Sequence, residues 1–354
     1  MAVKKLNRNL IETLDKSGMY QMLVDFPGQC QHARSLGKVF RPERQLENVK
    51  KIIFAGMGGS AMSGAILQTY LQDKIDLPIR VVQGYSLPSF VDKDSLLFAI
   101  SYSGNTEELL AVYKEAKKRG VKIIAITSGG KLKALTRKDK NSLIPIPTGF
   151  PPRAALGYLV IPALLALEKI NLISSQNKYL AESITTLKSS VRKLVIENRK
   201  DNLAMEIAKD FYGRIPVIYG SFEVTSAVAY RWRTQLAENS KILSFNHSFP
   251  ELNHNEIVGW QEQKSLYKNF IITTLRDKED HPRTKLRMEI TRSLLKGCPY
   301  KIIEVWSKGK SPLTRIFSLI ILGDFVSFYL AILNGVDPTP VERIELLKKR
   351  LKNR

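Results

Sequence analysis

The stretch Lys51-Ile-Ile-Phe-Ala-Gly-Met-Gly-Gly-Ser60-Ala-Met-Ser-Gly64 indicates how the first half of this chain folds. Its apolar, β-branched start predicts a buried strand, its glycines predict a tight turn, and the residues from Ser60 onward predict a helix. Backbone N–H groups at a helix N-terminus bind anions, and glycines let an anion approach the backbone closely. We therefore expect an anion-binding turn, although glycines with a purely structural role produce the same pattern.

A dinucleotide-binding turn is an alternative interpretation of these glycines. Such turns read Gly-x-Gly-x-x-Ala and also need an acidic residue at the end of the second strand, where it holds a ribose hydroxyl. Here the second strand ends with Val81-Val82-Gln83-Gly84, so the acid is missing. The sequence therefore does not support a nucleotide cofactor.

A second turn, rich in hydroxyl groups, follows the predicted strand Leu96–Ile100. It reads Ser101-Tyr-Ser-Gly-Asn-Thr-Glu-Glu108 and leads into a predicted helix. Three hydroxyl side chains around one tight turn direct their donors at one point, and a phosphate dianion suits such a point. The structural alternative is a serine-rich turn in which Thr106 only caps the helix.

Short apolar runs alternate with helical patterns along the chain, which is typical of an α/β fold with parallel sheets flanked by helices. Strands are predicted at 51–55, 79–83, 95–101, 122–127 and 142–145, then at 215–219, 269–274 and 300–306. Helices are predicted to begin near residues 60, 106 and 152, and to cover 159–172, 179–198, 226–238 and 339–351. A length of 354 residues favours two domains. We expect these to be residues 1–152 and 153–354.

The composition is that of a soluble globular protein, with 44% hydrophobic and 25% charged residues. We find no uncharged apolar run approaching about 18 residues, and no apolar stretch behind the basic N-terminus, so a cytoplasmic location is expected. The two cysteines, Cys30 and Cys298, lack partners at metal-ligand spacing. They are expected to be ordinary thiols in a reducing compartment.

The formal net charge of +22 is the unusual figure in the composition. A strongly basic chain raises the possibility of nucleic-acid binding. However, lysine and arginine are spread along the whole sequence, and no basic-aromatic pattern or known nucleic-acid motif accompanies them. We expect a solvated basic surface that attracts a small anionic substrate, and neither nucleic acid nor membrane as a partner.

Candidates for proton transfer lie in the second half. Glu238 is predicted at the end of a helix rich in cations, which would favour its ionised form as a base. Further along, residues 246–256 contain two of the four histidines, His247 and His254. Histidine titrates near neutrality and can exchange a proton with a ring oxygen. Glu223 is a rival acid, and a glutamate that only pairs with surface cations is the structural alternative.

A zinc site is another interpretation of residues 246–256. His247, Glu251 and His254 are all possible zinc ligands. Pro250 and the asparagines around it make the regular helix of zinc hydrolases improbable, and no cysteine is near. We therefore expect no metal, although ordinary structural histidines remain an alternative.

The two turn motifs, in this order and about forty residues apart, resemble those of the sugar isomerase (SIS) domain, a flavodoxin-like α/β unit that binds phosphosugars. The resemblance implies that Ser101, Ser103 and Thr106 bind the phosphate group. It also implies that the glycine-rich turn, with Gly58, Gly59 and Ser60, lines the sugar. Two such domains are expected in this chain.

The chain as a whole resembles the bifunctional phosphoglucose/phosphomannose isomerases. The match rests on both turns, on residues 149–154 around Arg153, on Glu238 followed by His254, and on Asp337-Pro-Thr-Pro-Val341. The resemblance implies that Glu238 moves a proton between C1 and C2, and that Arg153 stabilises the enediolate. It implies that Thr339 lines the pocket near C2 and C3.

The resemblance also implies that His254 reaches in from the partner subunit of a homodimer and opens the sugar ring, a role that His247 could fill instead. The expected reaction interconverts glucose 6-phosphate or mannose 6-phosphate with fructose 6-phosphate, without metal or cofactor. The main alternative is a phosphosugar-binding regulator without catalytic activity. Such proteins usually carry a DNA-binding helix-turn-helix, and we find none clearly before Lys51.

Overall fold

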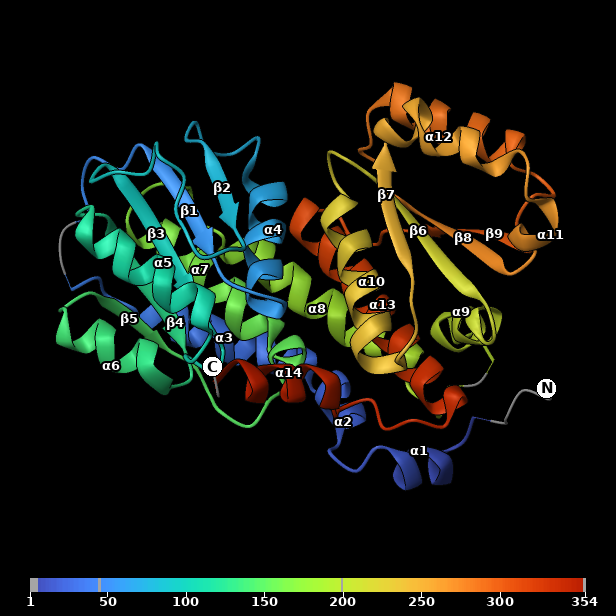
Figure 1. Cartoon of the computed structure of the whole chain (residues 1–354), viewed down its shortest axis with the longest axis horizontal. Coiled ribbons are helices and arrows are strands. Elements are labelled where there is room, and N and C mark those ends of the chain that lie inside the picture. Colours follow the sequence, from blue (N-terminus) through green and yellow to red (C-terminus); the bar gives the residue numbers. More distant parts are fainter. Residues whose placement is uncertain (1–5, 44–45, 199, 353–354) are drawn as a thin grey trace. The chain divides into compact units, whose positions relative to one another are not determined.

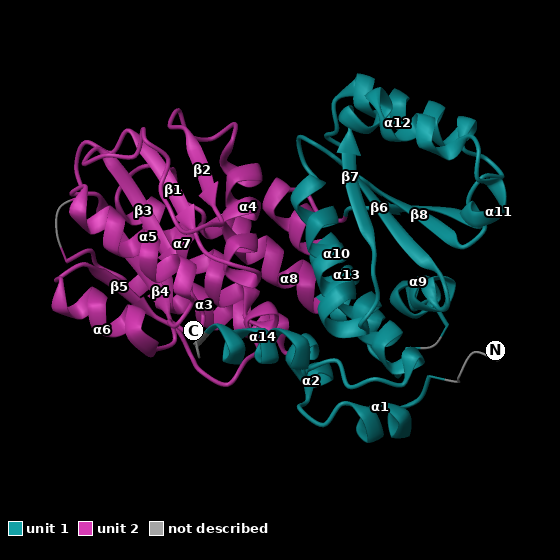
Figure 2. Cartoon of the chain, viewed as in Figure 1, with its two compact units in different colours: residues 1–24, 189–307, 319–354 teal, residues 25–188, 308–318 magenta. Residues whose placement is uncertain are grey.

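The computed structural model describes residues 6–43, 46–198 and 200–352 and contains two parallel β-sheets (Figure 1). The chain forms two compact units with one sheet each (Figure 2). Unit 2 consists of residues 25–188 and 308–318, and unit 1 consists of residues 1–24, 189–307 and 319–354. Two parallel sheets flanked by helices confirm the predicted fold class.

Unit 2 is built on a five-stranded sheet in the order β2-β1-β3-β4-β5, in which all neighbouring strands are parallel. The strands are β1 (Lys51–Ala55), β2 (Ile79–Val82), β3 (Ser95–Ile100), β4 (Lys122–Thr127) and β5 (Ser142–Pro145). The central strand β3 is buried at every position, as expected for a sheet covered on both faces. All five strands predicted in the first half are present.

Helices cover both faces of this sheet because successive strand residues point to opposite sides. On one face, Ile53 and Leu97 pack in a core with Val112 of α5 (Glu107–Lys118) and Leu132 of α6 (Gly130–Lys138). On the other face, Phe54 packs against α4 (Gly59–Leu71). The remaining helices that lie wholly in unit 2 are α3 (Phe26–Val39) and α7 (Leu156–Lys169).

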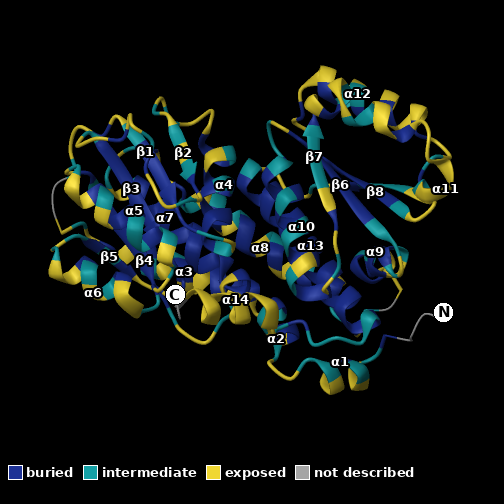
Figure 3. Ribbon diagram, viewed as in Figure 1, coloured by how far each residue is buried: buried dark blue, intermediate teal, exposed yellow. Residues whose placement is uncertain are grey.

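Unit 1 is built on a four-stranded parallel sheet in the order β7-β6-β8-β9. The strands are β6 (Ile215–Ser221), β7 (Phe245–Phe249), β8 (Phe270–Arg276) and β9 (Lys301–Trp306). The helices that lie wholly in unit 1 are α1 (Arg8–Leu14), α2 (Met19–Val24), α9 (Leu203–Phe211), α10 (Ser226–Ser240), α11 (Lys264–Tyr267), α12 (Pro282–Leu294) and α14 (Glu342–Lys352). The interior strands of both sheets are largely buried, whereas α6, α12 and α14 carry many exposed residues (Figure 3).

Two helices, α8 (Asn177–Leu194) and α13 (Pro312–Asn334), begin in the residues of unit 2 and end in those of unit 1. The two units are therefore interleaved along the sequence. The expected boundary after residue 152 divides the two sheets but not the two units, and it stays a prediction about the domains.

Sequence reasoning did not predict the helices α1, α2, α3 and α12, and it also missed β7 and α13. β7 is a five-residue edge strand that is exposed or only partly buried up to Ser248, so its apolar pattern is weak. α13 is buried almost all round and therefore lacks the one-sided apolar stripe of a surface helix. Both were placed by tertiary packing rather than by local pattern.

Among the described residues, α13 is the one helix long and apolar enough to cross a membrane, but its apolar stretch is wholly buried inside the protein. It also carries Asp324, whose carboxylate forms a bidentate ion pair with Arg231 of α10, with N–O distances of 2.7 and 3.1 Å. Burial raises the pKa of Asp324, against the attraction of Arg231. These features are those of a core helix in a globular protein.

Candidate active site

The two turn motifs lie at the same edge of the sheet in unit 2. β1 and β3 are parallel neighbours, so their carboxyl ends meet at this edge. The chain then enters α4 after β1 and α5 after β3. The strand order reverses between these two strands, and open α/β sheets bind ligands at such a point.

The glycine-rich turn brings the backbone at the start of α4 against residues 152 and 153. Gly58 has a φ of 52°, a conformation that glycine adopts without strain. A Cβ atom at Gly59 would lie 3.0 Å from the carbonyl O of Pro152 and 3.2 Å from the backbone N of Arg153. The structure therefore places Arg153, which is only 3% exposed, beside the glycine-rich turn.

The hydroxyl-rich turn is closed by hydrogen bonds around Ser101. The buried Ser101 Oγ lies 2.8 Å from Thr106 Oγ1 and accepts a bond from the N–H of Gly104 at 3.0 Å. Thr106 is the N-cap of α5 but its side chain makes no capping bond, and Ser103 is exposed. The hydroxyl groups of this turn thus stand next to the backbone N–H groups that begin α5, an arrangement suited to an anion.

Gly104 holds this turn against the next loop. Its φ of 68° is left-handed, and a Cβ atom there would overlap the carbonyl group of Gly129. Only glycine permits such a close backbone approach. The shape of the hydroxyl-rich turn therefore depends on Gly104 as well as on its hydroxyl groups.

Tyr102 joins the two turns and the segment around Arg153, and sequence reasoning assigned it no role. Its N–H donates to Ser60 Oγ at 3.3 Å, and its hydroxyl donates to the carbonyl of Pro147 at 3.0 Å and accepts from the N–H of Phe150 at 2.9 Å. Burial raises the pKa of Tyr102, so the phenol stays neutral. Its place between Ser101 and Ser103 was the available signal. All seven candidate residues of unit 2 thus lie in the two turns or in the segment around Arg153.

The candidates of unit 1 lie at two places. Glu238 is half-buried in the last turn of α10, and Thr339 lies in the loop that precedes α14. The ammonium group of Lys241 bonds the backbone carbonyls of Glu238, Pro338 and Pro340, so these two segments are neighbours.

His254 lies at the other end of β7 from Glu238. α10 ends just before β7 begins, whereas the exposed His254 closes a short helix, Glu251–His254, after β7 ends. Five strand residues span about 13 Å. Glu238 and His254 therefore lie beyond opposite ends of the same strand in unit 1.

The rival candidates have other partners. His247 lies on the edge strand β7, and its Nδ1 accepts the N–H of Ser248 at 2.8 Å. Glu251 accepts a bond from Asn255, and Glu223 accepts one from Thr284. Within the described residues, no group of three or more histidine, cysteine or acidic side chains could hold a metal ion.

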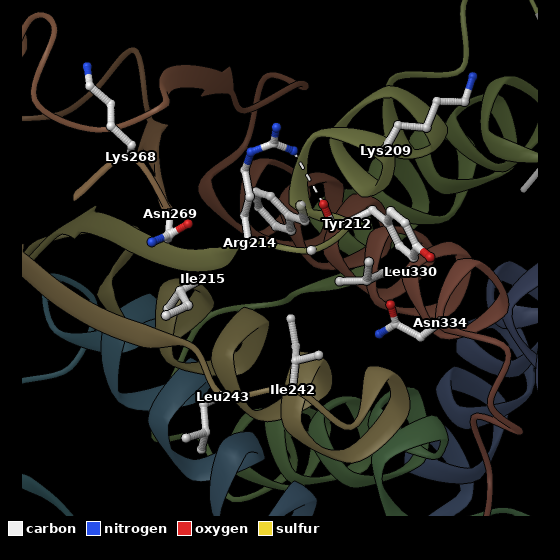
Figure 4. Close-up of a pocket in the computed structure, with 12 residues that line it drawn as sticks. Lys209, Tyr212, Arg214, Ile215, Ile242, Leu243, Lys268, Asn269, Leu330 and Asn334 are labelled. Atoms are coloured by element: carbon white, nitrogen blue, oxygen red, sulfur yellow. Dashed lines mark hydrogen bonds between the residues drawn. The ribbon is translucent and has the colours of Figure 1, made fainter. Parts of the chain in front are cut away.

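A cavity of about 960 Å³ lies elsewhere in unit 1 (Figure 4). It is lined by Arg214 and Ile215 at the start of β6, Ile242 and Leu243 before β7, and Asn269 before β8, among others. These residues mark the amino ends of the strands, and none of the candidate residues lines the cavity. Because no candidate residue lines it, we do not assign the reaction to this cavity.

Comparison with known proteins first defines the class. Residues 45–155 match the SIS domain, and residues 200–351 match the "Bacterial phospho-glucose isomerase C-terminal SIS domain". The C-terminal domain of glucosamine-fructose-6-phosphate aminotransferase from Francisella tularensis has a similar structure, with a TM-score of 0.70 over 92% of this chain and all of that one. At 17% identity, this likeness shows the fold alone. The protein is a two-domain SIS protein.

Two relatives then define the family. The chain is 42% identical to a bifunctional phosphoglucose/phosphomannose isomerase of Caldicellulosiruptor bescii, over 94% of this chain and 98% of the relative. It is 38% identical to one from Aquifex aeolicus, over 87% and 92% respectively. The chain belongs to the bifunctional phosphoglucose/phosphomannose isomerase family, which confirms the predicted family.

Proposed function

We propose that the protein is an aldose-ketose isomerase that interconverts glucose 6-phosphate and mannose 6-phosphate with fructose 6-phosphate. One observation carries the proposal: both turns and Arg153 lie together at the carboxyl edge of the sheet. The chain is also 42% identical to such an isomerase over nearly its whole length. A regulator without activity would not need a catalytic base. The family relationship favours the enzyme.

The chemistry needs one base and one stabilised intermediate. Removing the C2 proton of either aldose, or a C1 proton of the ketose, leads to the same enediol, which has no stereocentre at C2. Return of the proton to one face or the other of C2 then decides which aldose forms. Proton transfer of this kind is acid–base chemistry, so we expect it to proceed without a metal ion.

We assign the phosphate group to the hydroxyl-rich turn, with the sugar along Gly59 and Ser60. Hydroxyl and N–H donors around Ser101 and Thr106 support this assignment, because the phosphate accepts several charge-assisted hydrogen bonds. Arg153 is the cation assigned to the enediolate, whose charge develops only during the reaction. Glu238 is assigned as the base.

We also propose that the active site is completed by a second copy of the chain, with His254 opening the sugar ring across the interface. The positions of Glu238 and His254 at opposite ends of β7 support this, since both must act on the same small sugar. The face of α12 beside His254 also supports it. Asn253 bonds Thr291 of α12 at 2.8 Å, and the same helix exposes a row of apolar residues four apart, Leu286, Ile290 and Leu294. An exposed apolar row is typical of an interface.

A cytoplasmic location is the last part of the proposal. Both cysteines are free thiols, and Cys30 is buried. Free thiols are usual in a reducing compartment.

The test is a coupled assay with glucose 6-phosphate and with mannose 6-phosphate, in the presence of a chelator. We expect the wild type to turn over both sugars, and Glu238→Gln to lose about 10²- to 10⁴-fold in kcat on both, because one base serves both. Glu223→Gln is the matched control and should keep most of its activity. Binding of fructose 6-phosphate without turnover would overturn the proposal in favour of the regulator.

A further inference from the structure

Lys241 connects the two segments of unit 1 that carry Glu238 and Thr339. Its Nζ donates to the carbonyl oxygen of Glu238 at 2.5 Å, of Pro338 at 3.2 Å and of Pro340 at 2.6 Å. A single ammonium group therefore joins the last turn of α10 to residues 337–341, which we call the 337–341 loop.

The backbone at Lys241 would favour glycine rather than lysine. Lys241 follows the last residue of α10 with φ 59° and ψ 34°, and its N–H bonds the carbonyl of Leu236. Helices often end in this left-handed conformation, and glycine is the usual residue there because a Cβ atom makes it costly. Lysine at this position therefore costs backbone strain that glycine would avoid.

The 337–341 loop depends on donors from outside its own backbone. Pro338 and Pro340 have no N–H group, so two of the loop's residues cannot donate a backbone hydrogen bond. The N–H of Thr339 donates to Asp337 Oδ1 at 2.9 Å, and Lys241 bonds the carbonyls on either side of Thr339. Asp337 and Lys241 thus both hold the backbone around Thr339.

The end of α10 is attached to α13 by separate bonds. Asn239 Nδ2 donates to Ser327 Oγ at 3.0 Å, Ser240 Oγ donates to the Ser327 carbonyl at 2.6 Å, and Asn334 Nδ2 donates to the Ser240 carbonyl at 2.9 Å. Loss of the Lys241 ammonium would leave these contacts in place. It would remove the bonds by which one ammonium group joins the 337–341 loop to the last turn of α10.

We propose that Lys241 is a positioning residue that holds Thr339 at a set distance from Glu238 and thereby determines the relative rates on the two C2 epimers. This inference rests on the proposed function. The proton returns to one of the two faces of C2, and each face gives a different aldose. A side chain near C2 that shifts relative to the base therefore changes the ratio of the two aldoses formed. A shift of about 1 Å in such a group can cost up to 100-fold in rate.

The test compares kcat and KM for mannose 6-phosphate and glucose 6-phosphate in Lys241→Met, Lys241→Arg and Lys241→Gly. We expect Lys241→Met to lower kcat about 10-fold or more with little change in KM, and to shift the ratio of the two kcat/KM values about 3-fold or more. Lys241→Arg, which keeps a cationic donor, should restore most of both. Lys241→Gly should resemble Lys241→Met although it relieves the backbone, because it lacks the ammonium group.

Lys140→Gly is the matched control, because Lys140 is an exposed left-handed lysine with φ 52° at the end of another helix. It should leave the kinetics unchanged. If the wild type turns over both sugars but Lys241→Met and Lys241→Gly keep its ratio of kcat/KM values, the role proposed for Lys241 is wrong and the proposed function stands. A lower melting temperature of these variants would not change that conclusion. Absence of turnover in the wild type would overturn the proposed function and this role with it.

Discussion

At the scale of single residues, Ser101 is the centre of the hydroxyl-rich turn. Its Oγ already accepts the Gly104 N–H and contacts Thr106 Oγ1, so a bound phosphate would meet a group held in place. We predict that Ser101→Ala raises KM for hexose 6-phosphates about 10- to 100-fold, the usual effect of losing a hydrogen bond to a charged group. Steady-state kinetics would measure it.

The control for this prediction is Ser35→Ala, an exposed serine of α3. It should leave KM as in the wild type. If Ser101→Ala lowered kcat with KM unchanged, Ser101 would act on the reacting carbons rather than on the phosphate.

At the scale of elements, the contact between α10 and α13 supports the candidate base. The buried Trp232 of α10 donates to the carbonyl of Leu319, and a Cβ atom at Gly323 of α13 would overlap its indole ring. We predict that Gly323→Ala lowers the free energy of unfolding by about 1–3 kcal/mol, the usual cost of overpacking a core. Chemical denaturation would measure the change.

The matched control is Gly28→Ala in α3. No atom lies within 4 Å of a Cβ atom built at Gly28, and its backbone is not left-handed. This substitution should be neutral or slightly stabilising, because alanine favours helix more than glycine does. Equal losses of stability in both variants would mean that the Trp232 contact does not set the cost.

Asp280, before α12, should make stability depend on pH. Burial raises its pKa most, although bonds from Ser221 at 2.5 Å and from the N–H of Asp277 at 2.8 Å oppose this. The folded state therefore holds this proton more tightly than the unfolded state. Its contribution to stability is full below the unfolded pKa near 3.8 and is lost as pH rises through the raised pKa.

We predict that Asp280→Asn makes the free energy of unfolding fall less than in the wild type as pH rises through that window. Urea denaturation at a series of pH values would measure the difference. Asp76→Asn, at an exposed carboxylate, should follow the wild-type profile. If Asp280→Asn showed the same pH dependence of the free energy of unfolding as the wild type, Asp280 would not be the group that causes it.

At the scale of the whole molecule, the shared active site can be tested with hybrids. Glu238→Gln and His254→Asn should each be inactive alone. A hybrid dimer of the two contains one site with both wild-type residues and one site with neither. Random mixing makes half of the dimers hybrid, so we predict recovery of about a quarter of wild-type activity, as expected for a two-fold symmetric pair.

The hybrids would be made by mixing the subunits under conditions that exchange them, and sedimentation would verify the dimer. Mixed Glu238→Gln and Glu238→Ala chains serve as the control and should stay inactive. No recovery in the Glu238→Gln and His254→Asn mixture would mean that both residues act within one chain. Activity of His254→Asn alone would mean that His254 is not needed.

The sequence alone determined the strands of the first sheet, because each is a short apolar run bounded by glycine or polar turns. β1, β4 and β5 begin and end where predicted. It also located both turns, because the glycines and hydroxyl groups that suit an anion lie next to one another in the chain. These are local properties, and local pattern is enough to predict them.

Only the tertiary structure decided which distant residues meet. Arg153 lies beside Gly59, Tyr102 links both turns, and Lys241 joins Glu238 to the 337–341 loop. These contacts result from packing between elements that are far apart in sequence. The same holds for α13, whose helix is buried nearly all round and carries no one-sided pattern. The physical reason is that the free energy of such contacts depends on which surfaces become buried together, and a single segment contains only one of those surfaces.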